Sequence, residues 1–113
     1  MGVKSVSHET TFEEDTADHT AILSALSLLC EGVQKETAEQ KLLFKTVTVK
    51  IRYQGFETHT KSKTLPHLTN RIEDLKKTAR ELLLPYLEAD RKIRLVGVRV
   101  SNLVSCEKQK TLF

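Results

Sequence analysis

Hydrophobic residues recur along this chain with two different periods, and stretches of the two kinds alternate. Strict alternation of apolar and polar positions, or a β-branched run without helical spacing, predicts four strands, over residues 5–12, 44–53, 56–65 and 93–103. Apolar residues at every third or fourth position predict one helix after the first strand and another after the third. The predicted order of elements is therefore β-α-β-β-α-β.

The two helices are predicted from their apolar stripes and from the residues at their ends. The first helix is expected to take its N-cap from Asp15 or Thr16 and to give way to a linker near residues 34–38. Its buried stripe should consist of Ile22, Leu26, Leu29 and Val33, with Leu23, Ala25 and Cys30 beside them. The second is expected to end or kink at Pro85 and to bury Ile72, Leu75, Ala79, Leu82 and Tyr86.

The element order favours an α+β fold of the ferredoxin-like kind, in which both helices cover one face of a four-stranded antiparallel sheet. A two-residue turn at Gln54-Gly55 is expected to bring Phe56 opposite Tyr53. This pairing decides which residues of the third strand face the helices. The sheet face without helices should then present Thr48, Lys50, Arg52, His59, Lys61, Lys63, Arg99 and Ser101, while Thr58, Thr60, Ser62 and Thr64 turn toward the core.

The side chains expected on this uncovered face are mostly basic or hydroxylic, and Glu57 is the only acid on the outer sides of these three strands. Spaced Lys and Arg among Ser and Thr donors suit phosphate oxygens, whereas the lack of aromatic residues argues against stacking of single-stranded bases. The pattern predicts a surface for the backbone of a nucleic-acid duplex, with little sequence preference. The alternative is a solvated polar face whose Lys and Arg protect the sheet edges.

Charge is divided unevenly along the chain. Residues 1–40 contain two Lys against eight acids, and residues 41–113 contain sixteen Lys or Arg against seven acids. The basic part includes the last three predicted strands and favours an anionic partner, although ordinary solvated charge would give the same division. At 113 residues the chain is expected to form one domain.

No apolar run approaches the roughly 20 residues of a membrane-spanning helix, so the sequence predicts a soluble chain without a membrane partner. Cys30 and Cys106 are 76 positions apart and fit neither a metal-binding spacing nor a disulfide framework, which favours the reducing cytoplasm. Cys30 lies within the stripe of the first helix and is expected to act as a small buried hydrophobic residue.

Three segments match a known pattern, in order and at the spacing of one domain. Residues 92–103 (KIRLVGVRVSNL) resemble the last strand of the little-finger domain of Y-family translesion DNA polymerases. Residues 4–12 (KSVSHETTF) resemble the tether and first strand of that domain, and residues 60–66 (TKSKTLP) resemble its third strand. The resemblance covers almost the whole chain and is nearest to the DNA polymerase IV branch of bacteria and archaea.

This resemblance implies a little-finger domain over residues 5–104, preceded by a tether at residues 1–4, whose sheet lies in the major groove of primer–template DNA. It also implies that the family's catalytic carboxylates, which hold two magnesium ions for nucleotidyl transfer, belong to a catalytic core upstream. No catalytic residue, metal or cofactor is therefore expected in this chain. The implied partners are the duplex DNA, the catalytic core of the same polymerase and a sliding clamp, and the protein is expected to be a cytoplasmic monomer.

Residues 105–113 are expected to form a tail that docks on the sliding clamp. Residues 109–113 (QKTLF) resemble the core of bacterial clamp-binding motifs, in which Leu112 and Phe113 would fill a hydrophobic pocket and Gln109 would form a hydrogen bond beside it. The clamp box of archaea and eukaryotes requires two aromatic residues further on, so the type of clamp stays open. The alternative is a terminus whose exposed Leu-Phe pair has no partner.

Two other classes of domain share the predicted element order. An RNA-recognition module would need aromatic residues on the open sheet face, where this chain has Thr, Lys and Ser. A small-ligand regulatory domain would favour paired subunits and a glycine-rich loop after the first strand, where this chain has Glu-Glu-Asp. Binding to double-stranded and to single-stranded oligonucleotides at two salt concentrations would separate these possibilities.

Overall fold

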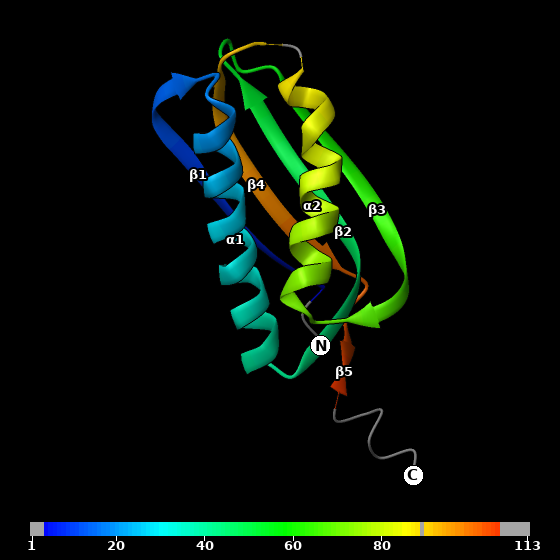
Figure 1. Cartoon of the computed structure of the whole chain (residues 1–113). Helices are drawn as coiled ribbons and strands as arrows, with labels where there is room; N and C mark the ends of the chain where they lie inside the picture. The colour runs from blue at the N-terminus through cyan, green and yellow to red at the C-terminus, as the bar shows by residue number, and fades with distance from the viewer. Residues whose placement is uncertain (1–3, 89, 107–113) are drawn as a thin grey trace.

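Alternating Val and Ile residues build the middle of a sheet, and two amphipathic helices cover one of its faces. The computed structural model describes residues 4–88 and 90–106, with the elements β1 (Ser5–Thr16), α1 (His19–Glu39), β2 (Leu42–Tyr53), β3 (Thr58–Thr69), α2 (Ile72–Leu87), β4 (Ile93–Ser101) and β5 (Val104–Ser105). Figure 1 shows α1 and α2 side by side on the same face of the sheet. The predicted α+β fold is confirmed, with the short strand β5 added after β4.

The four long strands lie in the order β1-β4-β2-β3, and every neighbouring pair is antiparallel. Because β4 lies between β1 and β2, and β2 lies between β3 and β4, each helix connects two strands that are separated by a third. β5 pairs with the beginning of β2, where Val104 lies opposite Leu43. The strands β2 and β4 are therefore central, and β1 and β3 form the two edges.

The core lies between the helices and the inner faces of β2 and β4. The residues of β2 and β4 that alternation predicted to face inward are all buried, namely Val47, Val49, Ile51, Tyr53, Val96, Val98 and Val100. The helices bury against them Ile22, Leu26, Cys30 and Val33 from α1 and Leu75, Ala79, Leu82, Leu83 and Leu87 from α2. Leu29, Ile72 and Tyr86 are only partly buried and pack at the margin of this core.

Helix α1 begins later than predicted because β1 continues through Thr16. The N-cap is Asp18, not Asp15 or Thr16: its carboxylate accepts hydrogen bonds from the backbone amides of Thr20 at 3.0 Å and Ala21 at 3.5 Å. The hydroxyl of Thr16 instead accepts a hydrogen bond from the amide of Asp18 at 3.0 Å. Two polar side chains thus satisfy the amide groups at the junction between β1 and α1.

Helix α1 also ends later than predicted, and residues 34–38 are helical rather than a linker. Thr37 is fully buried, and its hydroxyl donates a hydrogen bond to the carbonyl of Gln34 at 2.9 Å. Nε2 of His8 on β1 lies 2.9 Å from Oε1 of Glu36. The contact between His8 and Glu36 joins the last turns of the helix to β1, although no apolar period marks these turns in the sequence.

The two prolines do not end the elements in which they lie. Helix α2 continues past Pro85 to Leu87, whose buried side chain anchors the last turn. Strand β3 continues past Pro66, because an edge strand has outward amide positions where a proline removes no hydrogen bond of the sheet. The register of β2 and β3 shifts opposite this stretch, between Phe44 and Thr46.

Candidate nucleic-acid interface

The hairpin between β2 and β3 has a three-residue loop instead of the predicted two-residue turn. The amide of Tyr53 donates to the carbonyl of Glu57 at 2.9 Å, and its carbonyl accepts from the amide of Phe56, also at 2.9 Å. Gly55 (φ 95°) and Phe56 (φ 71°) both adopt left-handed backbone conformations, which strain a residue as bulky as Phe. Tyr53 therefore faces Glu57, one residue later than the predicted partner.

This longer loop shifts β3 by one residue relative to β2, which reverses the two faces of β3. The residues that pair with Val47, Val49 and Ile51 of the core face are Lys63, Lys61 and His59. These three side chains therefore lie on the helix side of the sheet, and the prediction that placed them on the uncovered face is wrong. Nζ of Lys63 lies 3.6 Å from Oε2 of Glu81 on α2.

The uncovered face, here called the open face, follows from the registers of all four strands. It consists of Ser5, Ser7, Glu9 and Thr11 from β1, Leu95, Gly97, Arg99 and Ser101 from β4, Thr46, Thr48, Lys50 and Arg52 from β2, and Thr58, Thr60, Ser62 and Thr64 from β3. The predicted positions of Thr48, Lys50, Arg52, Arg99 and Ser101 on this face are confirmed. Ten of its sixteen residues carry a hydroxyl group.

Hydroxyl groups on the open face contact one another across the strands. Oγ1 of Thr48 lies 2.7 Å from Oγ of Ser62, and the Nε of Arg52 donates to Oγ1 of Thr58 at 2.9 Å. The four hydroxylic residues of β3 were predicted to face the core, so their position on the open face was not foreseen. The residue types of β3 contain a signal for the correct orientation. On an edge strand, a Lys side chain opposite buried Val or Ile can extend past the apolar core and keep its charge in water, whereas Thr or Ser in the same position would place a hydroxyl group near apolar side chains.

The open face carries three cations, Lys50, Arg52 and Arg99, and one acid, Glu9. Nζ of Lys50 lies 3.4 Å from Oε1 of Glu9. Arg99 is exposed and has no ion-pair partner among the residues that the structure describes. These groups and the hydroxyls can donate hydrogen bonds to phosphate oxygens. None of the sixteen side chains is aromatic, so this face has no aromatic platform on which a base could stack.

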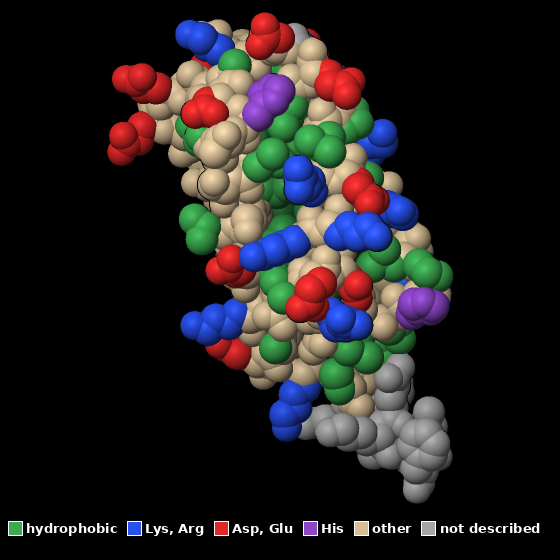
Figure 2. All heavy atoms as spheres, viewed as in Figure 1, with side chains coloured by type: hydrophobic (Ala, Val, Ile, Leu, Met, Phe, Trp, Pro, Cys, Tyr) green, Lys and Arg blue, Asp and Glu red, His purple; other side chains and the backbone are tan. Residues whose placement is uncertain are grey.

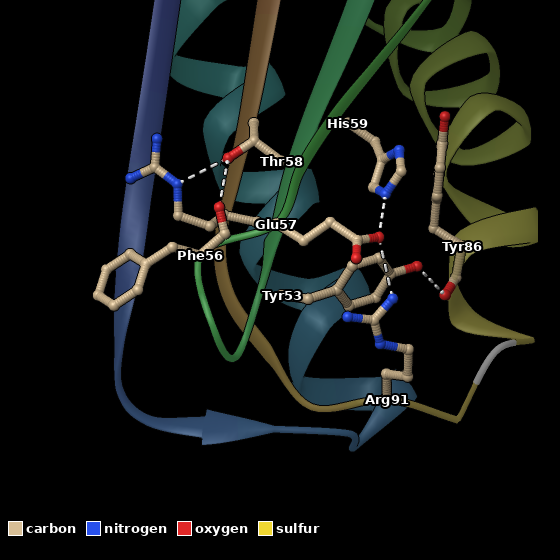
Figure 3. Close-up of polar contacts among 8 residues, drawn as sticks. Tyr53, Phe56, Glu57, Thr58, His59, Tyr86 and Arg91 are labelled. Carbon is tan, nitrogen blue, oxygen red and sulfur yellow. Dashed lines mark hydrogen bonds and ion pairs between the residues drawn. The ribbon is translucent and has the colours of Figure 1, made fainter.

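A cluster on the helix side braces the base of the β2–β3 hairpin (Figure 3). His59 and Arg91 both point at Glu57, with Nε2 of His59 2.6 Å and Nη1 of Arg91 3.1 Å from its Oε2. The hydrogen bonds from His59 and then from Arg91 hold the pKa of the Glu57 carboxyl below its ordinary value. The guanidinium of Arg91 also covers the ring of Tyr53, 3.9 Å from its centroid, and the Tyr53 hydroxyl donates to the carbonyl of Tyr86 at 2.9 Å. These contacts hold the hairpin in the register that defines the open face.

The opposite side of the domain, formed by the helices, carries charges of both signs (Figure 2). Nζ of Lys76 on α2 lies 2.8 Å from Oε2 of Glu31 on α1. Cys30 is buried beneath this surface, as predicted, and its burial raises the pKa of the thiol to about 12. Within residues 4–88 and 90–106, no group of His, Cys, Asp and Glu is arranged to hold a metal ion, and neither helix is long and apolar enough to cross a membrane.

Residues 3–112 match the C-terminal domain of the impB/mucB/samB family. The chain belongs to this family. It is 45% identical over 112 residues to the DNA polymerase IV of Methanoculleus marisnigri, which covers 98% of the chain and 31% of that relative. It is 40% identical to DNA polymerase IV 2 of Methanosarcina mazei, covering 97% of the chain and 30% of that relative. The chain therefore spans about a third of the length of these relatives.

Solved structures agree with this assignment. A little-finger domain of polymerase IV in complex with a β-clamp processivity factor is 25% identical, with a TM-score of 0.70 over 86% of each chain. A chimeric Y-family DNA polymerase superimposes with a TM-score of 0.81 at 23% identity, over 93% of this chain and 30% of that one. The resemblance to the little-finger domain of Y-family polymerases of the polymerase IV type is thus confirmed. Gln109, Leu112 and Phe113, the predicted clamp contacts, lie outside the described residues.

Proposed function

We propose that this domain holds the duplex part of primer–template DNA on its open face, as the DNA-binding domain of a lesion-bypass DNA polymerase. The observation that carries the proposal is the open face itself: hydroxyl groups and three cations spread over four strands, with no aromatic residue among them. Such groups hold phosphates without reading bases. The same absence of aromatic residues disfavours an RNA-recognition module.

The chemistry of the whole protein is proposed to lie in another part of it. Nucleotidyl transfer would be performed by a catalytic core, and the magnesium ions of that reaction would be bound there. In this scheme residues 5–104 bind DNA, residues 105–113 bind a clamp, and the protein acts as a monomer in the cytoplasm. A polymerase that must pass damaged template benefits from a grip on the duplex that does not depend on base sequence.

Binding of a fluorescent duplex and of the matching single strand tests the proposal. We expect the duplex to bind more tightly, because rigid spacing of its phosphates suits a rigid sheet. Three phosphate contacts would give a slope of log K against log salt no steeper than about −2.7, so a fourfold rise in salt would weaken binding by up to about fortyfold. Equal or tighter binding of the single strand, or affinity independent of salt, would contradict the proposal.

A second proposed contact joins the C-terminal tail to a sliding clamp. It is supported by the solved little-finger domain that forms a complex with a β-clamp. The amide of Cys106 donates to the carbonyl of Lys41 at 2.8 Å, which ties the beginning of the proposed tail to the residue before β2. From there Leu112 and Phe113 would enter an apolar pocket on the clamp, with Gln109 bonded beside it.

Leu and Phe side chains could each contribute roughly 1.5–3 kcal/mol when buried, before the cost of ordering the tail. We expect the double change Leu112→Ala and Phe113→Ala to abolish clamp binding in a surface-plasmon assay and to leave duplex binding unchanged. The matched change Lys110→Ala and Thr111→Ala should preserve clamp binding. If the Leu112 and Phe113 variant still bound the clamp normally, the contact would run through the folded domain instead.

A further inference from the structure

Glu9 is the one acid on a face that is otherwise hydroxylic and basic. It lies on β1 opposite Gly97, and Lys50 lies on β2 at the other side of the same glycine. Because Gly97 has no side chain, the carboxylate and the ammonium group approach each other above it, with Nζ of Lys50 3.4 Å from Oε1 of Glu9. Glu9 is about half exposed, and Lys50 about one third. The ion pair therefore sits at the surface, where a ligand can reach both partners.

The backbone at Gly97 forms the floor of a hollow of about 170 Å³ in the open face. The residues that line it include Ser7, Thr48 and Thr60 as well as Glu9, Lys50 and Arg99. A Cβ atom at position 97 would lie 3.1 Å from the Cβ of Glu9 and 3.6 Å from the Cβ of Lys50, so any larger residue would fill the floor and push the pair apart.

The donors around this hollow suit one kind of ligand. Two cations and three hydroxylic residues line this space, and none of them carries an aromatic ring on which a base could stack. A tetrahedral anion would accept hydrogen bonds from several of these donors at once. Among the residues that the structure describes, the carboxylate of Glu9 is the only ion-pair partner of Lys50, and it contacts the ammonium group as a phosphate would.

We propose that the hollow over Gly97 is the seat of one backbone phosphate of bound DNA, and that Glu9 competes with this phosphate for Lys50. The proposal rests on the proposed function of the open face. When the duplex binds, Lys50 turns from Glu9 to the phosphate, and Glu9 is left beside a negative charge. Glu9 therefore weakens the grip on DNA and reduces its dependence on salt, because the carboxylate that Lys50 leaves attracts a cation from solution, and this offsets the counterion that Lys50 releases from the phosphate.

The first test is Glu9→Gln, which keeps the size of the side chain and removes its charge. We expect the variant to bind a duplex about two- to fivefold more tightly at moderate salt, the scale of one surface charge interaction. The slope of log K against log salt should become steeper by up to about 0.9. The matched control is Glu14→Gln, which removes a charge from the same strand outside the open face and should have little effect on either quantity.

The second test repeats Glu9→Gln in a Lys50→Gln background. We expect the gain in duplex affinity to disappear there, because Glu9 then has no Lys50 to withhold. A gain that persists in this background, or that Glu14→Gln reproduces, would mean general charge repulsion and would overturn the proposal. No gain from Glu9→Gln in the otherwise unmodified domain, which keeps Lys50, would overturn it as well. Urea unfolding of each variant checks that the domain remains folded.

Two further measurements identify the ligand and separate this inference from the proposed function. Inorganic phosphate at constant ionic strength should not displace the duplex, since a single anion lacks the other contacts; displacement would mean a site for free phosphate and not for DNA. Arg99→Ala lies outside the Glu9–Lys50 pair. If Arg99→Ala leaves duplex binding unchanged, the open face is not the DNA face. If Arg99→Ala weakens binding while Glu9→Gln changes nothing, only the competition by Glu9 is refuted.

Discussion

Replacing Arg99 or Lys61 by Ala separates the two possible DNA faces of this domain. Both side chains are exposed cations, Arg99 on the central strand β4 and Lys61 on the edge strand β3. Arg99 lies on the open face opposite Thr48, whereas Lys61 lies opposite Val49, on the helix side. The two variants lose the same charge, so any difference between them reports the direction in which the side chain points.

The expected magnitude follows from counterion release. A cation that neutralises one phosphate contributes about 0.9 to the slope of log K against log salt. Arg99→Ala should therefore flatten the slope by about 0.9. The ratio between the affinity of the unmodified domain and that of the variant should then fall about 3.5-fold when salt rises fourfold. Lys61→Ala removes no phosphate contact and acts only through screened long-range charge, which fades beyond about 10 Å at 0.1 M salt.

Fluorescence anisotropy with a labelled duplex at four salt concentrations measures both slopes. We expect a flatter slope for Arg99→Ala and an unchanged slope for Lys61→Ala. The opposite result, a flatter slope for Lys61→Ala alone, would mean that DNA lies along the outer edge of β3 and that the register does not select the DNA face. Unchanged slopes for both variants would move the DNA to another surface altogether.

Three other predictions concern the framework of the domain. Asp18→Ala should lower the free energy of unfolding by about 1 kcal/mol in urea titrations, whereas Asp18→Asn, which keeps the cap, should cost much less; an equal loss in both would rule out capping. The lowered pKa of Glu57 means that its ion pairs stabilise the fold above the ordinary carboxyl range and are lost as pH falls through the lowered pKa. The melting temperatures of the unmodified domain and Glu57→Gln should therefore differ at neutral pH and converge in acid. Thiol reagents should modify Cys106 in the folded domain and Cys30 only upon unfolding; rapid labelling of Cys30 would refute its burial.

The central strands and the stripes of both helices were predictable because each has one apolar side. Val47, Val49 and Ile51 can only face the core, and this leaves one orientation for β2. The sequence THTKSKT of β3 has polar residues at both sets of alternate positions. Hydrophobicity therefore cannot select its face, and the predicted orientation followed from the predicted loop length.

Loop length was predicted from Gly55, which suits a two-residue turn as well as a longer loop. Contacts of Glu57 stabilise the longer loop. Its carbonyl accepts a hydrogen bond from the Tyr53 amide, and its carboxylate contacts both His59 and Arg91. Arg91 lies 34 residues away in sequence, so no local pattern could have revealed the contact. Similarly, the last turns of α1 are joined to β1 by the contact between His8 and Glu36, which are 28 residues apart and leave no apolar period in the sequence.

The register of β3 also changes how strongly this domain should depend on salt. With Lys61 and Lys63 on the open face, five cations would meet phosphates and the slope of log K against log salt would approach about −4.5. With Thr60 and Ser62 there instead, three cations remain and the slope is no steeper than about −2.7. Hydroxyl groups still donate to phosphates but release no counterion, so the contact stays broad while its salt dependence is shallow. Titration of the unmodified domain alone therefore distinguishes the two registers: a slope near −4.5 would require the cations of β3 to reach the DNA, against the pairing of Lys61 with Val49.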